Sequence, residues 1–344
     1  MSTAHQLLFG YDDGHRLLTG SRELAADTLV SLLGATDAAM SADSVPLVTG
    51  LALQATGEYA YCVTWSAPEV PRAGAVWAHA LVFDAAALGD AGRSDALLAL
   101  PRRPSAQPLE LSHYSQPLEL DRGGRGDVQA HLAPHPHDRE LLERIVGAAY
   151  GADSDGIVVD QDLGAAARAL LALWRAQWPQ LRSVFSFRTR ETVRREPSEF
   201  DLTVAAKVRG PEECPPAPST AAPSPWIKAL TDDLLADGRT PLRDFLWAFG
   251  PGEPPDRHRV RLLAKLWLRV AAGEELRVRA YLERHWPRPR DGAALKQSLF
   301  GSVENRWWRL DERTRVRTLL GGANGAWDLD ELELHDRARA LAIE

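Results

Sequence analysis

The sequence has only two cysteines, Cys62 and Cys214, which lie far apart in unlike surroundings. A disulfide framework and a cysteine-rich zinc module both need several cysteines, so the sequence excludes both. Apolar runs stay well short of the ~18–20 residues that span a bilayer. The first residues also lack the basic region and apolar stretch of a secretory signal. We therefore expect a cytoplasmic protein that does not act at a membrane.

Lysine is almost as scarce as cysteine. Of the 40 basic residues only four are lysines, namely Lys207, Lys228, Lys265 and Lys296. A P-loop requires a lysine between glycine and serine or threonine, because the lysine reaches the phosphates and the hydroxyl holds magnesium. None of the four lysines has these neighbours. The chain is therefore not a P-loop NTPase.

The composition is otherwise that of a globular protein, and 344 residues with 45% apolar side chains suffice for two domains. One segment interrupts the pattern: residues 210–225 read GPEECPPAPSTAAPSP and offer almost no large apolar side chain to bury. The formal charge is −9 up to residue 225 and +2 beyond it. We predict an α+β domain over residues 1–209, a linker over 210–225 and a helical domain over 226–344.

Strand and helix patterns follow one another in the N-terminal half. Residues 5–19 form a hairpin pattern in which Asp13-Gly14 favours a two-residue turn, and Ser21 can cap a helix that follows. Residue spacing predicts strands over 47–53, 58–65, 75–83, 184–190 and 200–208, and helices over 138–149 and 163–178. From residue 226 onward the spacing is helical throughout. The predicted fold class is α+β, with a mixed, mainly antiparallel sheet followed by an all-α part.

Two histidines and an aspartate are the candidates for catalysis. In the predicted hairpin Asp12 lies opposite His15, where a carboxylate would orient and charge the imidazole. The same contact could serve recognition or simply stabilise the turn. His79 shares a strand face with Trp77 and Leu81, and is either a satisfied core histidine or a catalytic group. A hydrolase or transferase centred on His79, His15 and Asp12 is the enzymatic alternative.

Other reactive side chains have simpler explanations. Cys62 alternates with the aromatic face of its strand and has no basic neighbour, which is typical of a core cysteine rather than a nucleophile. His131, His135 and His137 precede a helix in the segment HLAPHPHD, where two prolines stiffen the chain. A structural zinc site would need four well-placed ligands, so we interpret this segment as an exposed loop. We expect neither a metal nor another cofactor.

Basic residues recur every three or four positions in the C-terminal half, and this is the most distinctive charge pattern in the chain. Residues 257–317 carry 16 basic and 7 acidic residues. The two stripes consist of Arg257, Arg261, Lys265 and Arg269, and of Arg306, Arg309, Arg313 and Arg317. Such stripes could bind an acidic protein partner or nucleic acid, or could be solvated helix faces.

Three phrases of the N-terminal half match a known pattern when taken together. They are HQLLFGYDDGHRLL followed by Ser21, PRAGAVWAHALVF at 71–83 and WRAQWPQLRSVFSFRTR at 174–190. Over residues 1–210 the chain resembles the N-terminal domain, type one, of the bacterial GTPase-associated protein family. The family pattern falls on His5, Gln6, Gly10, Tyr11, Asp13, Gly14, His15, Arg72, Gly74, Val76, Trp77, His79, Trp178, Pro179, Leu181, Arg182, Phe185, Ser186 and Phe187. Ala73 replaces the usual proline.

The resemblance implies a protein that acts beside GTPases in NTP-dependent bacterial conflict or immune systems, and it implies no particular reaction. Our principal expectation is a non-enzymatic adaptor or regulator in antiviral defence. It would bind a protein partner, for which a GTPase encoded elsewhere is one candidate. The alternatives are the hydrolase or transferase described above and a nucleic-acid-binding protein that uses the basic stripes.

Overall fold

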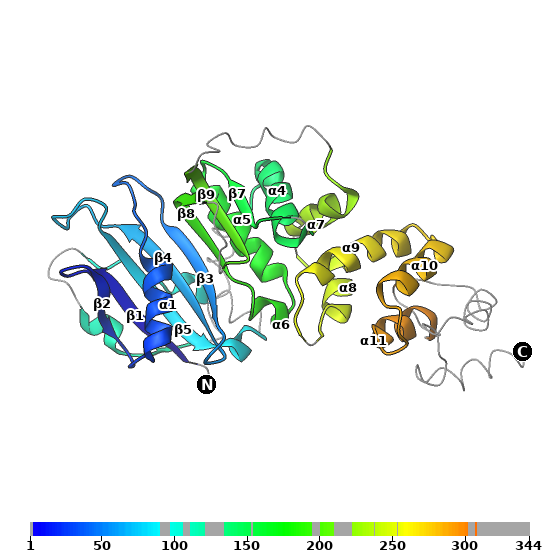
Figure 1. Ribbon diagram of the computed structural model, residues 1–344, viewed down its shortest axis with the longest axis horizontal. Coiled ribbons are helices and arrows are strands. Elements are labelled where there is room, and N and C mark those ends of the chain that lie inside the picture. Colours follow the sequence, from blue (N-terminus) through cyan, green and yellow to red (C-terminus); the bar gives the residue numbers. More distant parts are fainter. Residues whose placement is uncertain are drawn as a thin grey trace, which may run out of the picture. The chain divides into compact units, whose positions relative to one another are not determined.

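The fold is described from a computed structural model of the chain (Figure 1). Contacts divide the chain into two units: unit 1 comprises residues 1–237 and 252–257, and unit 2 comprises residues 238–251 and 258–344. The structure describes residues 3–89, 97–105, 111–120, 134–152, 154–194, 200–209, 222–236, 238–252, 254–301 and 307.

Five antiparallel strands form the first part of the sheet in unit 1. They are β1 (Thr3–Tyr11), β2 (His15–Gly20), β3 (Leu47–Leu53), β4 (Glu58–Ser66) and β5 (Val76–Asp84). Their order is β2-β1-β5-β4-β3, so β1 lies between β2, its neighbour in sequence, and β5, which is distant in sequence. The short strand β6 (Leu118–Glu119) pairs with the beginning of β1.

Three further strands extend the sheet beyond β3. β8 (Phe187–Arg194) follows β3, and then come β9 (Leu202–Arg209) and β7 (Ile157–Val159). β9 runs parallel to both of its neighbours, whereas β8 pairs with β3 in the antiparallel sense and over two residue pairs only. The sheet is thus mixed and mainly antiparallel, which confirms the predicted α+β class.

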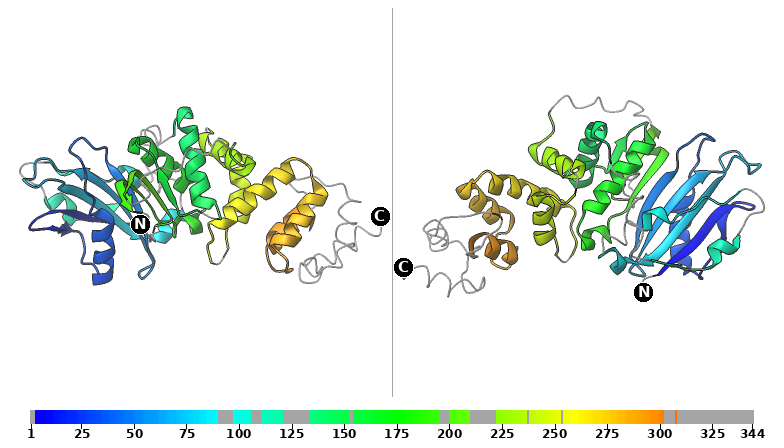
Figure 2. Two further views of the ribbon diagram at one scale, coloured as in Figure 1. Left: turned by 45° about the horizontal axis from the view of Figure 1, so that its top comes forward. Right: turned by 180° about the vertical axis from the view of Figure 1, so that it is seen from behind.

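Helices cover both faces of this sheet. Helix α1 (Ala26–Thr36) packs on the face that carries Leu7, Phe9 and Cys62. On the other face, α5 (Leu163–Ala176) places Trp174 between the rings of Tyr59 and Phe187. Its neighbours α4 (Arg139–Tyr150) and α7 (Pro225–Leu235) pack with it beside the parallel strands (Figures 1 and 2).

Short helical turns complete unit 1 as far as it is described. They are η1 (Ala85–Gly89), η2 (Leu111–Ser115), η3 (Pro136–Asp138) and α6 (Pro179–Arg182). The η2 turn contacts β1 and β2. The η2 turn is therefore held at the β1 side of the sheet.

The hairpin between β1 and β2 differs from the prediction in its turn. Tyr11 pairs with His15, so the loop has three residues rather than two, and the predicted pairing of Asp12 with His15 is wrong. Asp13 has φ of 55° and Gly14 has φ of 131°, and a glycine is needed at the second position. The one-residue shift applies from His15 to Leu17, and a bulge between Leu8 and Phe9 ends it before Thr19. Within this stretch the β2 side chains change face, and His15 accordingly stacks on Phe9.

Unit 2 is helical over its described residues. Its elements are α8 (Pro241–Phe249), α9 (His258–Ala271), α10 (Glu275–His285), α11 (Ala293–Lys296) and the π-helix η4 (Gln297–Gly301). Phe245 lies at the centre of an aromatic cluster with Phe249, Trp267 and Trp307. Among the residues described, no helix has both the length and the apolar character that crossing a membrane requires.

The predicted linker lies mostly outside the described residues, which resume at residue 222. Helix α7, which we assigned to the C-terminal domain from its position after the linker, is grouped by its contacts with unit 1. It packs on α4, and Arg139 of α4 forms an ion pair of 2.6 Å with Asp232 of α7. A domain boundary at residues 210–225 remains a prediction.

Candidate functional site

Several of the motif residues meet where β1 passes β5. The ring of Trp77 lies over Gly10, so closely that a Cβ on Gly10 would be 2.3 Å from a ring carbon. The indole Nε1 of Trp77 donates a hydrogen bond of 2.7 Å to Glu69, which also forms an ion pair with Arg103. These contacts explain why glycine and tryptophan occur together in the motif.

Tyr11 and Arg72 form a second motif contact. The guanidinium carbon of Arg72 lies 4.5 Å from the centre of the Tyr11 ring, which is the geometry of a cation–π interaction. This contact joins the end of β1 to the loop that precedes β5. Arg72 therefore stabilises the hairpin tip at this end of the sheet.

His79 lies fully buried on β5, opposite Leu8 of β1. Its Nδ1 accepts a hydrogen bond of 2.9 Å from the backbone N–H of Arg102, and its ring meets the edge of Tyr114. Burial, with smaller contributions from His113 and Arg102, lowers the pKa of His79 to about 3. The imidazole is therefore neutral at physiological pH, with its proton on Nε2 because Nδ1 is the acceptor.

Gln6 holds the same segment from the neighbouring strand. Its buried side-chain amide donates hydrogen bonds of 3.0 Å to the carbonyl of His113 and 2.7 Å to that of Gln116. Together Gln6 and His79 fasten residue 102 and residues 113–116 to one face of the sheet. No local pattern predicts this contact, because the partners are more than a hundred residues apart in sequence.

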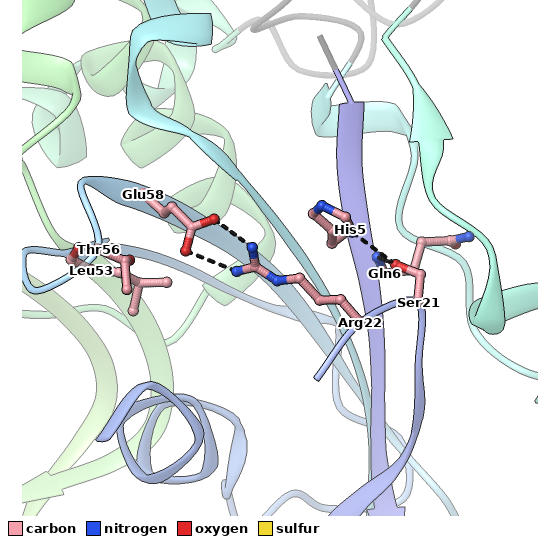
Figure 3. A network of polar contacts seen from close by, with 7 residues as sticks. All are labelled: His5, Gln6, Ser21, Arg22, Leu53, Thr56 and Glu58. Atoms are coloured by element: carbon pink, nitrogen blue, oxygen red, sulfur yellow. Dashed lines mark hydrogen bonds and ion pairs between the residues drawn. The ribbon is translucent and has the colours of Figure 1, made fainter. Parts of the chain in front are cut away.

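A network at the beginning of β1 involves His5, Ser21, Arg22 and Glu58 (Figure 3). The hydroxyl of Ser21 accepts a 3.0 Å hydrogen bond from the backbone N–H of Gln6 and lies 3.3 Å from Nδ1 of His5. The predicted role of Ser21 as a helix cap is wrong, because α1 begins at Ala26 without a side-chain cap. Ser21 instead fastens the end of β2 to β1.

Arg22 and Glu58 form a bidentate ion pair in this network, with hydrogen bonds of 2.7 and 2.8 Å (Figure 3). Hydrogen bonding to Arg22 lowers the pKa of the Glu58 carboxyl. Burial and then the Arg22 charge lower the pKa of His5. Because Arg22 engages both carboxylate oxygens of Glu58, the His5–Ser21 contact lacks the orienting carboxylate of a catalytic triad.

The three predicted catalytic candidates are not brought together. His15 lies on the α1 face, where its Nε2 is 3.0 Å from the hydroxyl of Thr36, and burial lowers its pKa. His79 lies on the opposite face, since it neighbours Ala78, which packs in the cluster under α1. Asp12 forms an ion pair with Arg16 rather than contacting His15.

The remaining reactive groups are Cys62 and the histidines of the segment HLAPHPHD, where residues 136–138 form the η3 turn rather than a loop. Cys62 is buried, and burial raises the pKa of its thiol to about 12, so it is protonated. The rings of His135 and His137 stack at 5.1 Å, while His131 is not among the described residues. Within the described parts of the chain, no group of three or more His, Cys, Asp or Glu side chains could hold a metal ion.

The first basic stripe divides between two environments. Arg257 precedes α9 and is bound within unit 1, where it donates 2.8 Å to the carbonyl of Asp201 and lies 3.2 Å from its carboxylate. Arg261, Lys265 and Arg269 lie on α9 in unit 2. The four arginines of the second stripe lie outside the described residues.

Helix α10 adds to the charge on α9. We define the cationic cluster as Arg261, Lys265, Arg269 and Arg284, the last from α10. Burial, then the charges of Arg261 and Arg269, lower the pKa of Lys265. Burial, then cations led by Arg284 and Lys265, lower the pKa of His285. These groups are therefore close enough to repel one another.

The cluster is held in place by aromatic packing rather than by opposite charges. The guanidinium of Arg269 lies 4.4 Å from the centre of the Tyr281 ring and donates a 2.7 Å hydrogen bond to the carbonyl of Lys265. Among the described residues, none of the four cations has a carboxylate within ion-pair distance. On α10, Glu283 forms an ion pair with Arg279, which is outside the cluster.

Comparison with known proteins bears on unit 1. Residues 3–100 match the family model described as GTPase-associated protein 1, N-terminal domain type 1. The match covers β1 to β5 and the first two motif phrases, and the third phrase at 174–190 lies beyond it. Neither the curated proteins nor the solved structures gave a match. The resemblance inferred from the motifs is confirmed over these residues: the first five strands of this chain are similar to the N-terminal domain, type one, of GTPase-associated protein 1.

Proposed function

We propose that this chain is a non-enzymatic adaptor or regulatory component that binds an acidic surface of a protein partner through the cationic cluster. A GTPase supplied by another chain is the first candidate for that partner. The setting would be a bacterial conflict or antiviral defence system. The family match over residues 3–100 supports an association with a GTPase system.

The cationic cluster is the observation that carries the proposal. Like charges four residues apart on a helix destabilise it by a few tenths of a kcal/mol per pair. Here three such charges on α9 are joined by Arg284, and no described carboxylate compensates them. The repulsion between these cations is best explained by an acidic partner that binds them. Charge complementarity would then raise both the specificity and the association rate of the complex.

The separation of the histidines supports the non-enzymatic interpretation over the hydrolase or transferase. His15 and His79 lie on opposite sheet faces, and each has a structural contact of its own. The neutral, buried imidazole of His79 holds a loop on the sheet. General acid–base catalysis needs a group within reach of a substrate and a pKa near the working pH, and His79 offers neither.

The test is to isolate partners from the native host by pull-down and mass spectrometry, and then to measure their association rates with purified protein. Lys265→Glu should slow association about threefold to tenfold at low salt, and the difference should shrink as salt rises. It should not lower stability, because it removes repulsion with Arg261 and Arg269. Arg277→Glu is the matched control, since Arg277 is an exposed α10 residue paired with Glu274 outside the cluster.

Equal association rates for wild type and Lys265→Glu would refute the docking role of the cluster. Binding of the wild type to arbitrary duplex DNA at 0.15 M salt, with a steep salt dependence, would favour the nucleic-acid alternative instead. Arg269 is a poorer choice for reversal because it packs on Tyr281, so a loss of binding there could reflect a packing change.

A further inference from the structure

The junction between β3 and β8 leaves part of β8 without a neighbour on one side. The backbone N–H groups of Val48 and Ala52 point at β8, where they donate to the side chains of Thr189 and Ser186 at 2.9 and 3.1 Å. Along a strand the backbone N–H and C=O groups of alternate residues point to the same side. Those of Gly50 therefore also point at β8, where Gly50 forms the hydrogen-bonded pair with Phe187. Phe187 therefore directs its own backbone groups towards β3.

The same alternation fixes the direction of the next residues of β8. Glu191 and Val193 have the parity of Phe187, so their N–H and C=O groups point away from β9 and towards the β3 side. Ser186, of the opposite parity, accepts a 3.2 Å hydrogen bond from Leu202 at the start of β9, which agrees with this assignment. Among the described residues, β3 pairs with β8 only at Arg188 and Phe187, so Glu191 and Val193 have no strand partner on that side.

Proline explains why β3 does not supply that partner. The pairing of Gly50 with Phe187, continued along both strands, would place Pro46 opposite Glu191. The observed pairing already ends at Thr49 and Arg188, since the N–H of Val48 donates to the side chain of Thr189. Proline has no N–H to donate, so Pro46 cannot resume the ladder at Glu191. The chain before Pro46 is held away from the β8 backbone, because Ser41 and Ser44 bind the side-chain carboxylate of Glu191 instead.

A pocket of about 390 Å³ lies at this place. It is lined by Ala38, Ala39, Met40 and Ser41 on one side and by residues 190–193 of β8 on the other. Three residues of the wall opposite β8 are small, the fourth is the buried Met40, and Ala39 is exposed. The free edge of β8 thus faces a space that another chain can enter.

We propose that this pocket binds a short extended segment of a partner protein, which adds to the sheet beside β8. Glu191 and Val193 are two residues apart, and an extended backbone repeats its donors and acceptors at this same spacing of about 7 Å. An extended segment of about three residues with small side chains could form backbone hydrogen bonds with both Glu191 and Val193. Such strand addition is a common mode of peptide recognition. The site lies in unit 1 and does not depend on the cationic cluster.

Amide hydrogen exchange of the free protein, followed by NMR, tests the premise. The amides of Glu191 and Val193 should exchange about a hundredfold faster than those of Arg190 and Thr192, which face β9. Similar protection at all four positions would overturn the proposal. Protection of Glu191 and Val193 that rises with protein concentration would indicate pairing with a second copy and would also overturn it.

A library of random linear dodecapeptides displayed on phage tests the binding itself. Peptides selected on the full chain should lose about tenfold or more of their affinity when backbone nitrogens at alternate positions are methylated, and little at the intervening positions. Ala39→Phe should abolish binding by filling the pocket. Ala42→Phe, also exposed but outside the pocket lining, is the matched control. Failure to select any peptide, or selection of peptides that bind Ala39→Phe equally well, would refute the proposal.

Discussion

Among single residues, His79 shows best how burial shifts a pKa and makes stability depend on pH. Its pKa is about 3 in the folded protein against 6.5 for an exposed histidine, so between these values the unfolded chain takes up a proton that the folded chain does not. Unfolding is therefore favoured as pH falls through this window, and the contribution of His79 to stability is complete only above pH 6.5. The protonation of His79 therefore reports whether the chain is folded, which supports a structural role for this histidine.

We predict that wild-type protein loses roughly 2 kcal/mol of this contribution between pH 8 and pH 5, at 1.36 kcal/mol per proton and pH unit. Urea denaturation at the two pH values measures it. In His79→Gln the dependence should be weaker, with lower stability at pH 8 and unchanged partner binding. A variant of normal stability that no longer binds its partner would instead assign His79 to a functional site.

Arg182 is the second residue whose burial makes a prediction. The residue is 1% exposed, and its guanidinium donates to the carbonyls of Leu88, Arg175 and Gln177 at 2.8–3.1 Å. We predict that Arg182→Lys lowers the free energy of unfolding by roughly 2–3 kcal/mol, because one ammonium cannot reach all three carbonyls. Arg144→Lys, at an exposed arginine that also binds a carbonyl, should cost under about 1 kcal/mol. Equal losses in urea denaturation would contradict this reasoning.

At the scale of elements, two glycines should respond oppositely to the same substitution. Gly34 lies in α1 with open space around its Cβ position, so Gly34→Ala should stabilise the protein by about 0.5–1 kcal/mol. Gly10→Ala should destabilise it by more than about 2 kcal/mol, because the ring of Trp77 must move. Thermal denaturation of both variants checks the pair, and stabilisation by Gly10→Ala would refute the packing argument.

Elements with strong local patterns were predictable from the sequence. Helices expected over 138–149 and 163–178 occur at 139–150 and 163–176, and the strand alternation around Cys62 and His79 is as predicted. The hairpin was located correctly, but its loop length was not, since Asp-Gly suits loops of two and of three residues. That single residue decided which face His15 occupies.

Contacts between distant segments were beyond prediction for a different reason. No local sequence pattern at Gln6 or at residues 113–116 indicates that the two contact each other. The cationic stripe was visible from spacing, yet the engagement of Arg257 with Asp201 and the addition of Arg284 depend on tertiary packing. Candidate sites on one helix could be inferred from sequence, whereas sites assembled from several elements could not.

For the whole molecule, the segment at 210–225 leads to a prediction about proteolysis. Its composition makes it the expected first site of cleavage. Because α7 packs on α4 and pairs Asp232 with Arg139, the two fragments should remain associated after the cut. They should co-elute in gel filtration and separate only in denaturant. Immediate separation under native conditions would mean that α7 belongs with the C-terminal part, as its position in sequence suggests.

The position of β1 has a consequence for synthesis on the ribosome. This first strand of the chain needs residues 113–119 before its buried glutamine is satisfied and its pairing with β6 is made. At about 5–20 residues per second, and with the exit tunnel still to pass, the nascent sheet keeps an incomplete edge for several seconds. A chain ending at residue 100 should therefore aggregate when one ending at residue 209 folds, which expression of both in a cell-free system can establish. If the shorter chain folds stably, the contacts of β1 with residues 113–119 are not required for folding, and the first five strands form a stable sheet without them.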